Sequence, residues 1–393
     1  MKKTIYWIYP HLLLEGGGTK FLFEVAKRLS NRYKVIIICN VGDRKIINDF
    51  VANGIHIKTI SILSANSNFY WAFMPFFLFW DFIAVSKLFT KADYIFATMF
   101  PSNLLAALFC ALFKKKYFYY CYEPYPYLHN KKFTSDHTLL KRIQILIFSY
   151  LYAWTDKFAV KRADKIFTLN QITKKMIKKT YNLNSLVTFM GVDLIHFKAY
   201  KNNKVKSLYK NKIIISHSTD YSIMKRTDLA IHTIQKVAKV YPNVALLITS
   251  TQPQSPNKKK YIELVKRLRL QKNVVFLDIV PYKELPLYYS ASLCYLSCSY
   301  DEMLGTTSSN LPVKEALACE TPAIRSNITK EDVEHGISGY LVDTRDPDEV
   351  SKKIIYLIRN QAKAKEMGRA GRKRILNDYT WDKVTKIISD NIT

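Results

Sequence analysis

The sequence is poor in several residues that would mark particular classes of protein. Its 393 residues include only 11 Gly and 13 Pro, which excludes collagen and low-complexity linkers. No internal repeat with a period of about 20–50 residues is visible, which argues against solenoids and propellers. None of the six cysteines belongs to a C-x-x-C pair, and most lie within apolar runs. Buried thiols in a reducing compartment explain them better than disulfides or zinc sites.

Acidic residues are also scarce, with 31 Asp and Glu against 60 Lys and Arg and a net charge of +29. Such a field favours phosphate-rich partners, which include nucleic acid, anionic lipid and phosphorylated small molecules. The basic residues are spread over both halves of the chain, and no helix-turn-helix, RRM or zinc-finger pattern is present. Nucleic acid is therefore the least favoured of the three partners.

No apolar run reaches the roughly 20 residues that a membrane span requires. The three most apolar segments are Phe69–Trp80, Leu104–Phe113 and Ile143–Trp154. Aromatic residues and lysines such as Lys114–Lys116 lie close to them, which predicts a surface that rests on anionic lipid. The alternative is a set of buried helices with solvated lysines.

The N-terminal apolar run follows two lysines and ends at Pro10-His11. No small-residue cleavage site follows it, so a first strand is expected rather than a signal peptide. The predicted location is cytoplasmic and peripheral, on the inner face of the membrane.

Strand and helix patterns alternate in two consecutive series. The first begins with Thr4–Tyr9 and Val35–Cys39, and the second begins with Ile213–Ser216. Continuous β-branched runs indicate strands buried on both faces, as in parallel sheets. The expected fold is α/β, with two doubly wound Rossmann-like domains facing across a cleft that holds the ligand. The polar stretch Lys198–Val205 suggests a linker.

The predicted domain bounds follow from that linker. Residues 1–197 form a first domain, with the expected membrane-surface contact, and residues 206–375 form a second domain. A C-terminal helix covers 376–393, and packing back onto the first domain is one arrangement for it.

Two loops precede helices in a way that suits an anion. Gly16-Gly17-Gly18 lies between the first strand and the first helix, where free N–H groups and the helix dipole favour phosphate. A plain tight turn is equally compatible with this run. In the second series, the polar loop that follows Ser299 leads into a helix near Pro312. Glu315 in that helix could accept from ribose hydroxyls or merely complement the dipole.

The second loop carries a resemblance to a known family. The letters SYDE…NLPVKEALACETPAI resemble the signature of retaining family 4 glycosyltransferases, also called glycosyl transferases group 1, which have the GT-B fold. Further segments resemble the family in the same order along nearly the whole chain. They are HLLLEGGGTKFLFEVAKRLS, RADKIFTLNQITKKMI, MGVDLIHF, KRTDLAI, VVFLDIVPYKELPLYYSAS and VEHGISGYLVD.

The resemblance implies transfer of a sugar from a nucleotide diphosphate sugar with retention of configuration, without a metal or other cofactor. It places Lys225 on the donor diphosphate and Glu315 on the nucleotide ribose. The other donor-binding positions that it implies are Gly17, Gly18, Ser218, Arg226, Val280, Thr307, Ser309, Asn310 and Leu311. The spelling Asp346-Pro347-Asp348 occurs in metal-dependent transferases, but here it suits a helix cap, so no metal is expected.

Three departures from the family pattern affect the site. Thr307 stands where the family has its first Glu, and Glu302 lies earlier, in what looks like a lengthened loop. Either Glu302 or Thr307 with neighbouring hydroxyls would meet the donor sugar. Ser218 stands where the family usually has Arg, so the positive charge would rest on Lys225 and Arg226.

The acceptor side is expected after the strand that ends at Cys121. Glu123 occupies a position that is often His in mannosyltransferase-like relatives, and His129 lies six residues further on. Both could contact a sugar, or either could make an ordinary loop hydrogen bond. His11, beside the glycine loop, is a similar candidate. The predicted catalytic residues are Glu302, Lys225 and Glu123.

The function predicted from these observations is a retaining hexosyltransferase. Its donor would be GDP-mannose, weakly favoured, or a UDP-sugar, and its acceptor a lipid-linked or membrane-proximal glycan. The alternatives are an inactive homologue that acts as a membrane-associated partner, and a nucleic-acid-binding protein.

Overall fold

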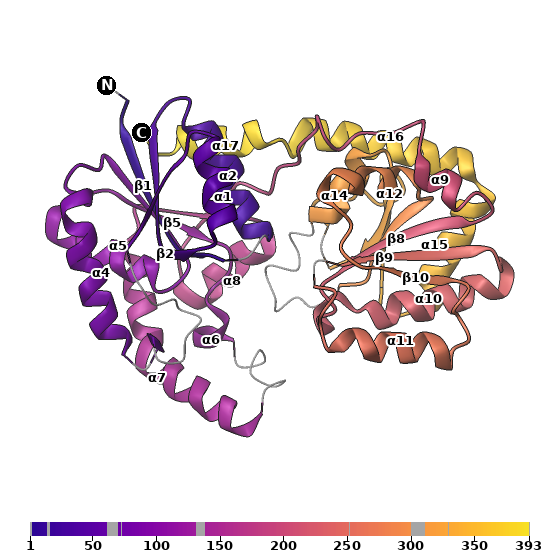
Figure 1. Ribbon diagram of the computed structural model, residues 1–393, viewed down its shortest axis with the longest axis horizontal. Coiled ribbons are helices and arrows are strands. Elements are labelled where there is room, and N and C mark those ends of the chain that lie inside the picture. The colour runs from indigo at the N-terminus through magenta and orange to yellow at the C-terminus, as the bar shows by residue number, and fades with distance from the viewer. Residues whose placement is uncertain are drawn as a thin grey trace. The chain divides into compact units, whose positions relative to one another are not determined.

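A computed structural model describes residues 2–13, 16–60, 70–71, 73–130, 138–250, 252–299, 311–328 and 330–392. They form two compact units, one of Met1–Gly191 with Trp381–Thr393 and the other of Val192–Thr380. Each unit is built on one parallel sheet with helices packed on its faces (Figure 1). The α/β class and the two doubly wound sheets predicted from the sequence are confirmed.

The sheet of the first unit has seven strands in the order β3-β2-β1-β4-β5-β6-β7. Their bounds are β1 Thr4–Leu12, β2 Lys34–Gly42, β3 His56–Thr59, β4 Tyr94–Thr98, β5 Tyr117–Cys121, β6 Lys165–Thr168 and β7 Leu186–Val187. The chain leaves β1 toward β2 and β3 and returns to β4 on the other side of β1. Loops therefore diverge at the carboxyl ends of β1 and β4, where doubly wound sheets bind ligands.

Helices cover the two faces of this sheet with different cores. They are α1 Gly17–Leu29, α2 Arg44–Ala52, α4 Met74–Phe89, α5 Ser102–Phe113, α6 Pro126–His129, α7 Leu139–Lys161, α8 Gln171–Tyr181 and α17 Trp381–Asp390. One core joins α4, α5, α7 and α8 to Tyr117, Tyr119 and Cys121 of β5. The other face is aromatic, with Trp7, Phe96 and Tyr120 beneath Phe21 of α1.

The sheet of the second unit has six strands in the order β10-β9-β8-β11-β12-β13. Their bounds are β8 Ile213–Thr219, β9 Val244–Ser250, β10 Val274–Leu277, β11 Cys294–Ser297, β12 Ala323–Ser326 and β13 Gly339–Val342. The helices are α9 Lys204–Leu208, α10 Thr227–Val240, α11 Asn257–Arg267, α12 Leu285–Ala291, α14 Leu311–Ala318, α15 Pro347–Arg359 and α16 Gln361–Asp378. The β8–β11 neighbours form the corresponding point of divergence.

The chain passes between the units at Gly191 and again at Thr380, where the sequence suggested 197 and 375. Val192 and Thr380 pair as a parallel bridge within the second unit. The stretch Lys198–Val205 packs there too, because Asn203 Nδ2 donates to the Leu287 carbonyl of α12 at 2.7 Å. It therefore does not link the two units.

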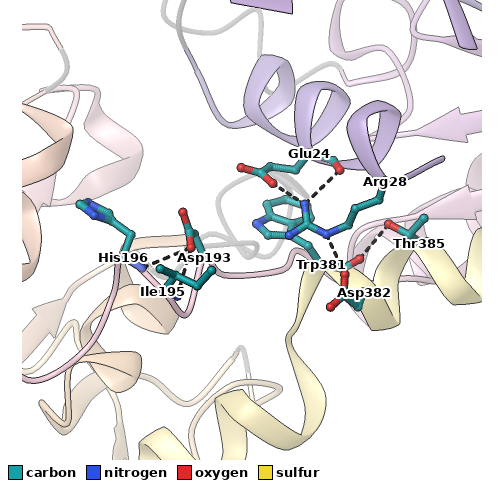
Figure 2. Close-up of polar contacts among 8 residues, drawn as sticks. All are labelled: Glu24, Arg28, Asp193, Ile195, His196, Trp381, Asp382 and Thr385. Atoms are coloured by element: carbon teal, nitrogen blue, oxygen red, sulfur yellow. Dashed lines mark hydrogen bonds and ion pairs between the residues drawn. The ribbon is translucent and has the colours of Figure 1, made fainter. Parts of the chain in front are cut away.

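Helix α17 lies in the first unit, against α1. The indole of Trp381 meets the ring of Phe21 edge to face, with centroids 5.9 Å apart. Arg28 Nε donates to Asp382 Oδ1 at 2.9 Å, as Figure 2 shows. Gly191 is required at this junction, because a Cβ there would lie 2.6 Å from the backbone nitrogen of Trp381.

Candidate active site

Lys225 lies just beyond the carboxyl end of β8, at the last residue of a 3₁₀ turn, Ile223–Lys225. Its side chain is half-buried, and Nζ makes no hydrogen bond or ion pair with any residue that the structure describes. Burial lowers its pKa, the nearby Asp220 carboxylate raises it, and the Arg325 guanidinium lowers it. A lysine so placed has a charge without a fixed partner, which suits an anionic ligand.

Arg226, the neighbouring cation, has a partner in its own helix. Its backbone is left-handed, with φ 48°, and it caps α10. Its Nε and Nη2 donate to the two oxygens of Asp228 at 3.0 and 2.6 Å. Asp228 lies in the first turn of α10, and Arg226 is its N-cap. The predicted sharing of the diphosphate between Lys225 and Arg226 stays a prediction, with only Lys225 lacking a counter-ion among the described residues.

Ser218 and Glu315 are joined by hydrogen bonds on one face of the sheet. Ser218 Oγ lies 2.7 Å from Thr249 Oγ1 and 3.4 Å from the hydroxyl of Tyr289. The Tyr289 hydroxyl donates to Glu315 Oε2 at 3.5 Å. The backbone N–H of Ser218 donates to the hydroxyl of Tyr295 at 3.3 Å. Two residues that lie far apart in the sequence therefore share one polar chain.

His217 stabilises this region and was not singled out by sequence reasoning. Its Nδ1 lies 2.9 Å from the Leu296 carbonyl, and its Nε2 lies 3.1 Å from Thr227 Oγ1. Burial lowers its pKa to about 4, so the ring is neutral at pH 7 and ties β8 to β11 and α10. The available signal was a histidine within a buried strand that continues the apolar run 213–215.

Of the other residues predicted to bind the donor, some lie in described elements or loops and some lie outside the described residues. Leu311 opens α14, and Val280 is half-buried in the loop after β10. Glu302, Thr307, Ser309 and Asn310 lie outside the described residues, so their predicted roles stay predictions.

The glycines of the first unit lie at the start of α1. Gly16 caps the helix in extended conformation. A Cβ on Gly18 would lie 2.8 Å from the Tyr9 hydroxyl and 2.9 Å from Cε2 of Tyr122. The Tyr122 hydroxyl donates to the Gly18 carbonyl at 2.9 Å. Close packing of two tyrosines therefore requires glycine at 18, whereas the nearest atom to a Cβ on Gly17 would be 3.9 Å away.

His129 ends the short helix α6 at the carboxyl edge of the first sheet. Its Nε2 lies 2.6 Å from Oδ2 of the fully buried Asp156. Asp156 also accepts from Asn103 Nδ2 at 2.6 Å and from the Tyr181 hydroxyl at 2.7 Å. The carboxylate thus fixes the imidazole through one nitrogen. The proposed acceptor role of His129 would use the other nitrogen.

The two other acceptor-side candidates lie at neighbouring strand ends. Glu123 is half-buried in the segment that follows β5. His11 is half-buried near the end of β1, and burial lowers its pKa. The structure places both at the carboxyl edge of the first sheet, as expected for residues that follow parallel strands.

Two parallel α/β sheets with these strand orders define the GT-B class of glycosyltransferases. HepE of Anabaena, in a crystal structure described with UDP and glucose, superposes with a TM-score of 0.76 over 99% of both chains at 15% identity. Such a likeness concerns the fold alone. Residues 199–374, which cover most of the second unit, match the family model described as Glycosyl transferases group 1. Over those residues the chain is similar to that family.

Curated relatives cover parts of the chain. A protein of Haemophilus influenzae described as an uncharacterized glycosyltransferase is 28% identical over 230 residues, 58% of this chain and 60% of the relative. A GDP-mannose-dependent alpha-(1-6)-phosphatidylinositol monomannoside mannosyltransferase of Mycolicibacterium smegmatis is 28% identical over 165 residues. That match covers 40% of this chain and 41% of the relative.

Proposed function

We propose that this chain transfers a hexose, with mannose favoured, from a nucleotide diphosphate sugar to a lipid-linked or membrane-proximal glycan, with retention of configuration. The family supports the transferase activity. A mannosyltransferase among the relatives supports GDP-mannose, and a structural neighbour described with UDP and glucose supports a UDP-sugar. The experiment below therefore compares GDP-linked and UDP-linked donors directly.

The observation that carries the proposal is the arrangement at the carboxyl ends of β8 and β11. Lys225 supplies a half-buried positive charge without a fixed counter-ion among the described residues, and Glu315 lies on the Ser218–Tyr289 hydrogen-bonded chain. Negative charge builds on the β-phosphate as the sugar leaves, and a preplaced cation in a partly dry site stabilises it strongly. Glu315 would accept hydrogen bonds from the ribose hydroxyls.

The chemistry proposed here uses no metal, because Lys225 carries the compensating charge. The acceptor hydroxyl would attack the anomeric carbon from the face that the diphosphate leaves. Its proton would pass to the departing diphosphate oxygen, which balances the transfer. Glu302 or Thr307 would face the donor sugar, and Glu123, His129 and His11 would contact the acceptor.

Radiolabelled GDP-mannose, UDP-glucose and UDP-N-acetylglucosamine, each with a polyprenyl-diphosphate glycan, test this activity. We expect turnover of one donor, and a loss of at least 100-fold in kcat/KM when Lys225→Ala removes the diphosphate cation. The matched control is Lys236→Ala on α10, whose lysine pairs with Asp348 at 2.7 Å. Nucleotide binding without turnover of any donor would favour an inactive homologue instead. Full activity of Lys225→Ala would refute the assigned site.

The acceptor class is supported by exposed apolar stripes on the first unit. In α7, Leu140, Ile147, Tyr150 and Trp154 are between 56% and 85% exposed, and their spacing of three to seven residues keeps them on one side of a helix. Helix α4 exposes Phe76, Phe79 and Trp80 in the same way. No helix in the described part of the chain is both long and apolar enough to cross a membrane.

The proposed occupant of these stripes is an anionic lipid surface. Helix α7 also carries Lys141, Arg142, Lys157 and Lys161, and interfacial helices combine apolar stripes with such basic residues. Flotation with phosphatidylcholine vesicles, with and without phosphatidylglycerol, tests this binding.

We expect the wild type to float with the anionic vesicles, and the double variant Leu140→Glu with Ile147→Glu to remain behind. The control Leu208→Glu alters an equally exposed leucine of the second unit. Unchanged flotation of the double variant would refute lipid binding by α7. A change in its mass by light scattering, without a change in flotation, would identify the stripe as an interface between copies.

A further inference from the structure

The second unit contains a cluster of three buried charged side chains that the proposed chemistry does not use. Lys314 of α14, Arg325 of β12 and Asp332 have side chains that are at most 3% exposed. Arg325 Nη1 donates to Asp332 Oδ1, and Lys314 Nζ lies 3.7 Å from Asp332 Oδ2. Two cations therefore share one carboxylate. Arg325 Nε has no hydrogen-bond partner among the described residues.

Such a cluster is costly to bury. An ion pair removed from water regains its desolvation cost only with good geometry and satisfied hydrogen bonds. Asp332 matches one of the two cations, and the charge of Glu331 also acts on Lys314. A donor nitrogen of Arg325 is unsatisfied within the described structure, and an added anion would compensate the charge of this guanidinium.

The strand register places Arg325 on the same face of the sheet as Ser218, and in the same row of residues that pair across neighbouring strands. Arg325 pairs with Ser297 of β11, and Tyr295 of β11 pairs with Ser216 of β8. Extending that register brings Ser218 level with Ser297, so Ser218 and Arg325 lie two strands apart on one row. Their Cα atoms are then about 10 Å apart. Ile324, the next residue of β12, points to the opposite face and belongs to the apolar core there.

The electrostatic neighbours of Arg325 agree with that placement. Its charge contributes to the lowered pKa of Lys225. It also opposes the rise that burial causes in the pKa of Tyr295, whose hydroxyl accepts from the Ser218 N–H. Arg325 and Lys225 therefore repel each other, and an anion held beside Lys225 would relieve the repulsion. Arg226 already pairs with Asp228.

We propose that Arg325 supplies the second positive charge of the donor diphosphate site. It acts from its buried position on β12, level with Ser297 of β11 and Ser218 of β8. This inference rests on the proposed function. Arg325 acts on the diphosphate through its field, since its side chain is buried, and Asp332 positions its guanidinium. Position 218, where the family usually has arginine, carries a serine in this chain, and Arg325 lies two strands away in the same sheet.

Isothermal titration of the full chain with UDP, UMP, GDP and GMP measures the contribution of the second phosphate. We expect the wild type to bind one diphosphate more tightly than its monophosphate. Arg325→Met should reduce that preference roughly tenfold, because opposite charges in a partly dry site still interact strongly over about 10 Å, which is the separation of the Ser218 and Arg325 Cα atoms. Arg325→Lys should keep most of it.

The matched control is Lys314→Met, which removes the other cation of the same cluster. Its ammonium lies 5.2 Å from the ring centroid of Tyr379, and Lys225 is not among the groups that alter its pKa. We expect its preference for the diphosphate to change by less than about twofold. A purely structural role for the cluster predicts lower melting temperatures for both variants, with the wild-type preference kept in each.

A third variant keeps the proposal testable if Arg325→Met does not fold. Replacing the whole cluster, as Lys314→Met with Arg325→Met and Asp332→Val, leaves no buried charge unpaired, and such exchanges are often tolerated. If a folded variant without Arg325 keeps the wild-type preference for the diphosphate, the inference about Arg325 is overturned and the proposed function is not. A wild type that binds none of the four nucleotides and turns over no donor would instead refute the proposed function.

Discussion

Asp81 should destabilise the first unit at neutral pH. This residue of α4 is 2% exposed, and Asn40 Nδ2 donates to its Oδ2 at 2.7 Å. Its Oδ1 has no hydrogen-bond partner in the described part of the structure. Burial raises the pKa of the carboxyl from 3.8 to about 6, and the hydrogen bond from Asn40 opposes that rise only in part.

The magnitude follows from the two pKa values. A difference of about two units corresponds to about 3 kcal/mol between the charged and neutral forms. The protonated form is favoured in the folded chain, so this stability is fully present below pH 3.8 and is lost as the pH rises through 6. Asp81→Asn has nearly the same shape, keeps the acceptor for Asn40 and cannot ionise. It should therefore stabilise the first unit by about 2–3 kcal/mol above pH 7 and by almost nothing below pH 4.

Urea unfolding at pH 7.5 and pH 4, followed by tryptophan fluorescence, measures this difference. Asp49→Asn on α2 changes an exposed aspartate and serves as the control. A destabilised Asp81→Asn variant at pH 7.5 would show that the folded chain prefers the ionised carboxylate. A gain of equal size at both pH values would show that the effect is not electrostatic.

Three further changes test other parts of the structure. Gly18→Ala should cost about 1–3 kcal/mol by overpacking against two tyrosines, and Gly17→Ala much less; thermal unfolding compares them. His217 contributes stability that is present above pH 6.5 and lost as the pH falls through about 4. The free energy of unfolding of His217→Gln, measured by urea titration, should therefore change less between pH 6.5 and pH 4 than that of the wild type. Trp381→Ala should cost about 3–5 kcal/mol by emptying the space beside α1, measured by urea unfolding with Phe21→Leu for comparison.

The architecture was predictable because the central strands are continuous apolar runs. Val35–Cys39 lies within β2, and Ile213–Ser216 opens β8, where burial on both faces selects β-branched residues. The edge strands β3 and β7 were not predicted. They are only four and two residues long, and β3 also contains polar residues. A strand so short leaves no periodic pattern to read.

The border between the units was missed for a different reason. A polar, lysine-rich stretch at 198–205 resembles a linker in composition. Its Asn203 side chain nevertheless caps α9 and bonds to α12. The real border depends on the pairing of Val192 with Thr380, which lie almost half the chain apart. Composition reports local solvation, and it carries no information on pairing at that separation.

The candidate site shows the same division between local and long-range information. Lys225 and Glu315 could be identified because short segments around them resemble a family pattern, whereas the connection of Glu315 to Ser218 through Tyr289 required the fold. An arginine within β12 looks like an anomaly in a strand when it is read alone. The strand register places Arg325 level with Ser218, the position where the family usually has an arginine. The Coulomb interaction depends on the distance between the charges and on the local dielectric, and not on which strand carries the charge. A missing cation in such a site should therefore be sought along the row, across neighbouring strands, as well as along the sequence.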